Sequence, residues 1–134
     1  MGNPTLYFDR CFGKSLPDLI RRAKPPFGVE YHHDPNNNFP QNMEDDEWLN
    51  AVGSQGWIVF SHDRRFHSDG PSITAIRQHK IGCFYLSGAS LPIWDKFRIF
   101  AKHYKRVEDI IRDTRKPFIY HVKTDRVLNV KMPN

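Results

Sequence analysis

The chain has 134 residues, of which 39% are hydrophobic, 13% aromatic and 26% charged. This composition suits one compact domain over residues 1–134 and excludes an intrinsically disordered chain, which would be poor in aromatic residues. No apolar run approaches the roughly 20 residues of a membrane-spanning helix. Residues 1–5 lack a basic cluster followed by an apolar stretch, so we expect no secretory signal. Cys11 and Cys83 are too few for a disulfide framework, so we expect free thiols and a cytoplasmic protein.

The net charge of +5 is unevenly distributed along the chain. Residues 96–131 contain eleven Lys or Arg against four Asp or Glu, whereas residues 34–47 include five acidic residues. A basic half beside an acidic region suits a protein that holds a polyanion such as a nucleic acid. A solvated helix face kept for solubility would give the same pattern, so charge alone leaves both interpretations open.

The first two thirds of the chain alternate between strand patterns and helix patterns. Apolar runs rich in β-forming residues predict strands, and apolar residues spaced by three and four predict amphipathic helices. In chain order the patterns predict a strand over 5–9, a helix over 15–24, a strand over 27–32, a loop over 34–42, a helix capped by Asp45 or Asp46, a strand over 57–60, a helix over 71–79 and a strand over 81–86.

The last third of the chain predicts a long helix followed by a hairpin. Ser90 is the expected N-cap of the helix, whose apolar stripe consists of Ile93, Phe97, Phe100, Tyr104, Val107 and Ile111. Strands over 118–122 and 126–130 are expected to pair as the hairpin. Strands alternating with helices predict a three-layer α/β/α fold, in which helices cover both faces of a mainly parallel sheet.

Acidic residues from three places in the chain are predicted to meet at one edge of this sheet. Asp9 ends the first strand, Asp63 follows the strand over 57–60, and Asp45 and Asp46 open the preceding helix. The carboxyl ends of the strands form the functional crevice of open α/β sheets. Grouped carboxylates repel each other unless a cation offsets their charge, and Mg²⁺ or Mn²⁺ prefers oxygen ligands. Taken alone, Asp45 or Asp46 can be explained as a helix cap and Asp63 as a turn residue, and such an explanation is weakest for Asp9. Together the acids favour a metal site that activates water against a phosphodiester.

The same residues carry a resemblance to a known family. From Asp45 to Phe66 an acid opens a helix, a glycine ends it, an apolar strand follows, and Ser61-His-Asp-Arg-Arg-Phe66 closes the segment. This order resembles the signature of PIN-domain nucleases, and Asp9 after Leu-Tyr-Phe is similar to the first acid of that family. The similarity covers roughly residues 5–90 and is nearest to the small PIN-like toxins of the VapC type.

The resemblance implies a PIN-like fold and a metal-dependent endoribonuclease that uses Mg²⁺ or Mn²⁺. Carried over by position, Asp9, Asp45 and Asp63 are the expected catalytic and metal-binding residues, with Asp46 as the alternative to Asp45. Ser61 is expected to hold a site carboxylate or a water by hydrogen bonding. The resemblance also implies RNA as the substrate, an antitoxin protein as a partner and pairing into a homodimer.

Basic residues flank the predicted acids and are the expected substrate contacts. Arg10 and Lys14 follow the first acid, and Arg64 and Arg65 follow the last. A guanidinium can clamp a phosphate with two hydrogen bonds. The alternative is that these residues only neutralise local negative charge.

One acid of the family pattern has no clear counterpart in this sequence. The family usually has an acid between the first strand and the second acidic motif, and Glu30, Asp34 and Glu44 are the available substitutes. The sequence therefore leaves open two interpretations, a three-carboxylate enzyme and a PIN-like module that has lost catalysis and binds RNA or a protein. A receiver-type phospho-acceptor also needs an Asp at a strand end, but the paired acids expected after its first strand are missing.

Overall fold

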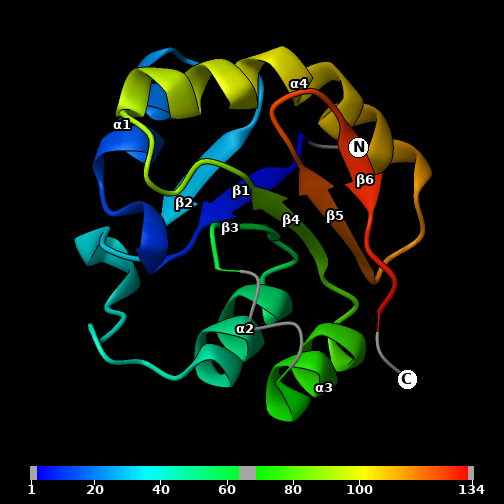
Figure 1. The fold of residues 1–134 in the computed structure, drawn as a ribbon. Coiled ribbons are helices and arrows are strands. Elements are labelled where there is room, and N and C mark those ends of the chain that lie inside the picture. Colours follow the sequence, from blue (N-terminus) through cyan, green and yellow to red (C-terminus); the bar gives the residue numbers. More distant parts are fainter. Residues whose placement is uncertain (1–2, 64–68, 133–134) are drawn as a thin grey trace.

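A mixed β-sheet forms the centre of the molecule (Figure 1). The computed structural model describes residues 3–63 and 69–132, and within these ranges six strands form the sheet. The strands are β1 (Thr5–Phe8), β2 (Gly28–Tyr31), β3 (Ile58–Ser61), β4 (Gly82–Leu86), β5 (Phe118–Val122) and β6 (Val127–Asn129). Their order is β2-β1-β3-β4-β5-β6; the first five run parallel and β6 pairs antiparallel with β5. The prediction of a mainly parallel sheet with a C-terminal hairpin is confirmed.

Helices cover both faces of the sheet. Within the described residues they are α1 (Ser15–Arg22), α2 (Asp45–Ser54), α3 (Gly70–Gln78) and α4 (Ile93–Asp113), together with the short 3-10 helices η1 (Arg10–Phe12) and η2 (Pro35–Asn37). Helices α1 and α4 lie on one face, and α2 and α3 lie on the other (Figure 1). None of these helices is both long and apolar enough to cross a membrane.

Two hydrophobic cores separate these layers, and the strands contribute to both. In β1, Leu6 and Phe8 pack into the core beneath α1 and α4, while Tyr7 packs into the core beneath α2 and α3. In β3, Phe60 and Val59 divide in the same way. Side chains alternate between the faces of a strand, so a strand covered on both faces needs a continuous apolar run. This requirement explains the continuous apolar runs Leu6–Phe8 in β1 and Ile58–Phe60 in β3.

The chain reverses its direction across the sheet at β1. From β1 it moves outward to β2, and then returns to place β3 on the other side of β1. Such a switch point opens a crevice at the carboxyl ends of the strands. Asp9 directly follows β1 and Ser61 is the last residue of β3, so both lie at this carboxyl edge.

The predicted cap of α2 is wrong by one residue. Glu44 is the N-cap residue, and its backbone N–H donates to the Glu47 carboxylate over 3.4 Å. This reciprocal arrangement places an acid at the cap and another three residues later. Asp45 is therefore the first residue of the helix, and its carboxylate does not cap the helix. The N-cap of α4 is likewise Pro92 instead of Ser90.

The buried face of α4 is broader than the predicted stripe. Its buried residues are Lys96, Ile99, Phe100, His103, Val107 and Ile110. Of the predicted stripe, only Phe100 and Val107 are fully buried, while the other four positions are partly buried. Helix α4 packs against both the sheet and α1. Two adjacent sides of the helix are therefore buried, one against each neighbour.

Candidate active site

Asp9 is a buried carboxylate at the carboxyl end of β1. Its side chain is only 4% exposed. Oδ1 accepts a hydrogen bond from the backbone N–H of Cys11 over 3.0 Å, which caps η1, and Oδ2 accepts one from the Ser61 hydroxyl over 2.5 Å. The contact from Ser61 joins the ends of β1 and β3, and it holds the Asp9 carboxylate by a hydrogen bond.

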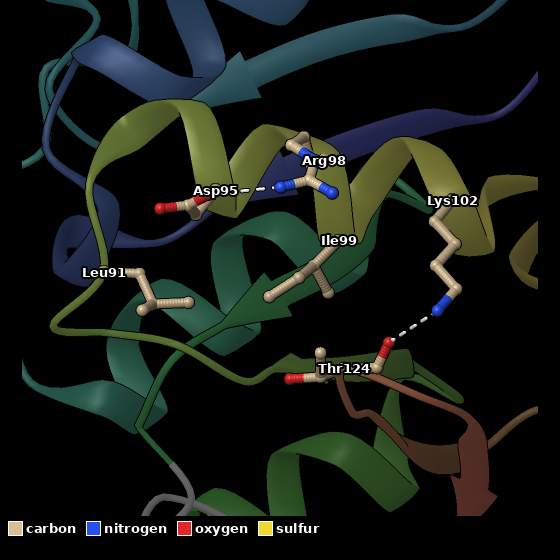
Figure 2. A pocket seen from close by; sticks show the side chains of 6 residues that line it. All are labelled: Leu91, Asp95, Arg98, Ile99, Lys102 and Thr124. Atoms are coloured by element: carbon tan, nitrogen blue, oxygen red, sulfur yellow. Dashed lines mark hydrogen bonds and ion pairs between the residues drawn. The ribbon is translucent and has the colours of Figure 1, made fainter.

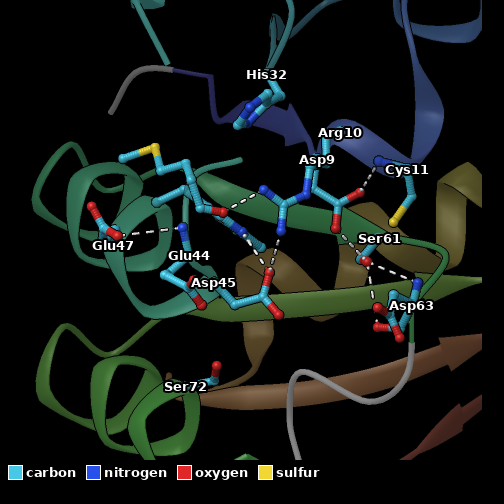
Figure 3. A network of polar contacts seen from close by, with 12 residues as sticks. Asp9, Arg10, Cys11, His32, Glu44, Asp45, Glu47, Ser61, Asp63 and Ser72 are labelled. Carbon is cyan, nitrogen blue, oxygen red and sulfur yellow. Dashed lines mark hydrogen bonds and ion pairs between the residues drawn. The ribbon is translucent and has the colours of Figure 1, made fainter. Parts of the chain in front are cut away.

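Ser61 connects Asp9 to the segment that follows β3. Its hydroxyl, which is fully buried, accepts a hydrogen bond from the backbone N–H of Asp63 over 2.9 Å while donating to Asp9. Figure 3 shows Asp9, Ser61 and Asp63 arranged side by side at the ends of the two neighbouring strands. The side chain of Ser61 therefore sets the relative position of two predicted site acids.

The electrostatic environment of Asp9 disfavours its charge. The pKa of Asp9 is raised from its ordinary value of 3.8 to about 6, mainly by burial and to a smaller extent by the nearby Asp45 carboxylate, against the hydrogen bonds from Ser61 and Cys11. Within the described residues, no Lys, Arg or His pairs with Asp9. A buried carboxylate in this state is stabilised by any cation that reaches it.

Asp45 is the second predicted acid, and it is tied to β1 by Arg10. The Arg10 guanidinium pairs with Asp45 Oδ1 over 3.4 Å and also donates to the backbone carbonyls of Gln41 and Met43 (Figure 3). The indole N–H of Trp48 donates to the same Asp45 oxygen over 3.0 Å. Arg10 thus connects the start of α2 to the end of β1. Its guanidinium N–H groups donate to acceptors within the protein.

The remaining predicted contacts differ in how the structure places them. Asp46 is half-buried in the first turn of α2, and Asp45 alone of the two acts on the pKa of Asp9, so the geometry favours Asp45. Lys14 is exposed and precedes α1 without capping it through its side chain. Arg64 and Arg65 lie outside the described residues.

The three substitutes for the missing fourth acid have structural roles. Asp34 is buried, pairs with Arg21 over 3.1 Å and caps η2. Glu30 accepts a hydrogen bond from the Asn37 amide over 3.5 Å. Glu44 is the exposed N-cap of α2. These contacts favour a site of three carboxylates from β1, α2 and the end of β3.

The acidic side chains at this edge offer the type of ligand atom that a hard divalent cation binds. Asp9, Asp45 and Asp63 offer carboxylate oxygens, the ligands that Mg²⁺ and Mn²⁺ prefer, and Asp9 lacks an internal cation among the described residues. In the parts of the chain that the structure describes, no three His, Cys, Asp or Glu side chains are grouped tightly enough to hold a metal ion. The structure brings the acids to one edge, with Asp45 held by Arg10.

His62 is a further polar residue at this edge, on the opposite face from Ser61. Its Nδ1 lies 2.7 Å from the backbone oxygen of Leu86, and its ring packs on Phe12 with centroids 4.0 Å apart. Nε2 is the sole buried side-chain nitrogen or oxygen within residues 3–63 and 69–132 that has no hydrogen-bond partner. A cavity of about 310 Å³ is lined by Cys11, His62, Asp63 and Ala89. In the sequence, His62 could have been placed at this edge because it directly follows Ser61. Side chains alternate between the faces of a strand, so His62 is expected on the face opposite Ser61.

Comparison with known proteins assigns most of this region to one family. The family described as a PIN like domain matches residues 4–88, which include β1 to β4 and the three acids of the site. No significant match was found among curated proteins or among solved structures.

Proposed function

We propose that this chain, which belongs to the PIN-like domain family, is a Mg²⁺- or Mn²⁺-dependent endoribonuclease. PIN-like domains are generally nucleases. The observation that carries the proposal is Asp9, a buried carboxylate that accepts hydrogen bonds from Ser61 and Cys11 and has no cationic partner among the described residues. Burying an unpaired charge costs free energy, so this arrangement favours a site that is completed by a cation from outside.

Asp9, Asp45 and Asp63 are the residues that would hold the ion. When bound, it would supply an activated water for attack on a phosphodiester. Ser61 keeps the Asp9 carboxylate oriented and ties it to the backbone of Asp63. Arg10 holds Asp45 close to the end of β1 and limits the negative charge that the three acids accumulate.

Cleavage of a single-stranded RNA in Mn²⁺ tests this proposal. We expect Asp9→Asn and Asp63→Asn each to lower the cleavage rate by at least about 100-fold, because removing even an outer partner of a metal ligand costs about 10- to 100-fold. The matched control is Asp125→Asn, an exposed acid of the β5–β6 turn whose nearest ion pair, with Arg126, spans 3.9 Å. Full activity in both site variants would refute the nuclease.

A second proposal is a PIN-like module without catalysis that binds RNA or a protein. It is favoured by the engagement of Asp45 with Arg10 and Trp48. Calorimetric titration with Mn²⁺ separates the two proposals. Heat of binding that disappears in Asp9→Asn supports the enzyme, and absence of any heat in the wild-type protein supports the module.

The cellular role is proposed from the resemblance to VapC-type toxins. In that role the chain is the toxin of a toxin–antitoxin pair, forms a homodimer, and is inhibited by an antitoxin segment that covers the acidic edge. Growth arrest on expression of the wild-type chain, but not of Asp9→Asn, is the expected result.

A further inference from the structure

Lys96 is a charged residue at a core position of α4. It is 8% exposed and lies on the same helix face as Ile99, Phe100 and Val107. Within the described residues no hydrogen bond or ion pair reaches its ammonium group. The ammonium nitrogen is not among the fully buried polar atoms without a partner, so it keeps some access to solvent. The stem of Lys96 is thus packed among apolar side chains, and its charged end reaches solvent without a protein partner among the described residues.

The position of Lys96 along the sheet follows from its helix neighbour Phe100. The Phe100 ring contacts Phe8 and Phe60, with centroids 6.0 and 5.5 Å apart. Lys96 is one helical turn earlier on the same face, and α4 starts at the carboxyl edge because it follows β4. One turn of helix corresponds to between one and two residues of strand. Lys96 is therefore level with the residues that follow Phe8 and Phe60, which include Asp9.

The cavity beside Asp63 includes a residue from the face of the sheet that Lys96 covers. His62 lines this cavity together with Asp63, and its ring packs on Phe12, which belongs to the core beneath α1 and α4. Asp45 reaches the carboxyl edge from α2, and Lys96 reaches it from α4 on the other face of the sheet.

Other cations of α4 are engaged with the protein. Figure 2 shows the neighbouring cavity, of about 270 Å³, in which Arg98 pairs with Asp95 over 3.6 Å and Lys102 donates to the backbone oxygen of Thr124 over 3.2 Å. Lys105, further along the helix, pairs with Glu108 over 3.3 Å. Lys96 differs from these three in being both buried and unpartnered within the described part of the chain.

We propose that Lys96 binds a phosphate group of the nucleic-acid strand held at the carboxyl edge of the sheet, opposite the carboxylates. This proposal rests on the proposed nuclease function and adds a substrate contact to it. A phosphate beside the acids would meet carboxylate repulsion on one side, and a lysine on the other side offsets it. An ammonium on a packed stem reaches the phosphate with little loss of side-chain entropy, because burial has already restricted the stem.

Substitution of Lys96 by methionine separates this role from a structural one. Methionine keeps an unbranched apolar stem and removes the charge. If Lys96 serves the ligand, Lys96→Met lowers affinity for RNA and leaves the melting temperature unchanged, because the apolar stem is kept and the ammonium has no protein partner among the described residues. A lysine that only supports the fold would give a lower melting temperature instead.

Fluorescence anisotropy of a short labelled single-stranded RNA, measured in EDTA so that no cleavage occurs, tests the proposal. We expect Lys96→Met to weaken binding about tenfold or more and to reduce the slope of log affinity against log salt by about 0.7, the value for one phosphate contact on a single strand. Lys96→Arg should retain most of the affinity. The matched control Lys105→Met removes an exposed, ion-paired lysine of the same helix and should change affinity less than twofold.

Equal affinities for Lys96→Met and Lys105→Met would overturn the proposal. Its failure is distinguishable from failure of the nuclease, because cleavage that depends on Asp9 can persist while Lys96→Met binds RNA normally. Conversely, weakened RNA binding in Lys96→Met without any Mn²⁺-dependent cleavage by the wild-type chain supports Lys96 as a nucleic-acid contact and refutes the enzyme.

Discussion

The ends of β1 and β2 carry two buried aspartates in nearly the same local setting. Asp9 and Asp34 are 4% and 6% exposed, and each caps a short 3-10 helix by accepting a hydrogen bond over 3.0 Å from the backbone N–H two residues later. Their other oxygens differ. Asp34 meets the guanidinium of Arg21 over 3.1 Å, whereas Asp9 meets the hydroxyl of Ser61 over 2.5 Å.

This difference distinguishes a structural carboxylate from one that can serve a ligand. Arg21 neutralises Asp34, also donates to the backbone oxygen of Val29 over 2.6 Å, and lies 4.9 Å from the centroid of the Tyr31 ring. The charge of Asp34 therefore stabilises the edge of the sheet. Asp9 receives neutral donors, so its charge remains uncompensated within the described residues. Burial and hydrogen bonding are common to both sites, and the internal cation is what separates them.

The two aspartates should respond to neutral substitution with opposite signs, the larger effect being at Asp9. Its raised pKa means that the folded protein binds the proton more tightly than the unfolded chain. This contribution to stability is fully present below about pH 4 and is lost as the pH rises through about 6. We expect Asp9→Asn to be more stable than wild type by about 2 to 3 kcal/mol at pH 7. Urea unfolding in EDTA should show the difference shrinking toward pH 4, and a difference independent of pH would contradict it.

Asp34→Asn should lower the free energy of unfolding at pH 7. Breaking a buried ion pair costs about 3 to 5 kcal/mol, but the Arg21 side chain is 38% exposed, so screening reduces the expected loss to about 2 kcal/mol. Asp18→Asn is the matched control, because it breaks the exposed pair with Arg22 on α1 and should change stability by less than about 0.5 kcal/mol. If Asp34→Asn and Asp18→Asn had equal effects in urea unfolding, the Arg21 pair would not stabilise the fold. Asp34 would then no longer differ from Asp9 in having a stabilising cation.

Ser61→Ala tests the comparison of Asp9 with Asp34 by removing the neutral hydroxyl that donates to Asp9. The variant leaves Asp9 with the Cys11 N–H, so we expect a stability loss of about 1 kcal/mol and about tenfold weaker Mn²⁺ binding. Ser72→Ala is the control: Ser72 is equally buried, and its hydroxyl donates to Asp69 over 2.8 Å. It should cost similar stability and leave the Mn²⁺ titration unchanged. Identical Mn²⁺ affinities for the two variants would count against a role of Ser61 at the site.

Much of the fold was predictable because local patterns and the sheet agree. Continuous apolar runs such as 57–60 are needed for strands buried on both faces, and the parallel topology brings the residues after β1 and β3 to one edge. That is why Asp9 and Asp63 could be placed at one edge from order and spacing, whereas the expectation for Ser61 came from the family resemblance. The helix cap at Glu44 was missed by one residue because several consecutive acids compete for it, and the reciprocal bond with Glu47 decides among them.

The partner of each polar group was decided by tertiary structure alone. The sequence determined that acids would gather at the carboxyl edge, since that follows from the alternation of strands and helices. It did not determine that Arg21 would neutralise Asp34, that Arg10 would fasten Asp45, or that Lys96 would be buried without a partner among the described residues. These outcomes depend on how α1 and α4 pack on the sheet. Electrostatic energy depends on distance and burial, and neither quantity is a local property of the chain.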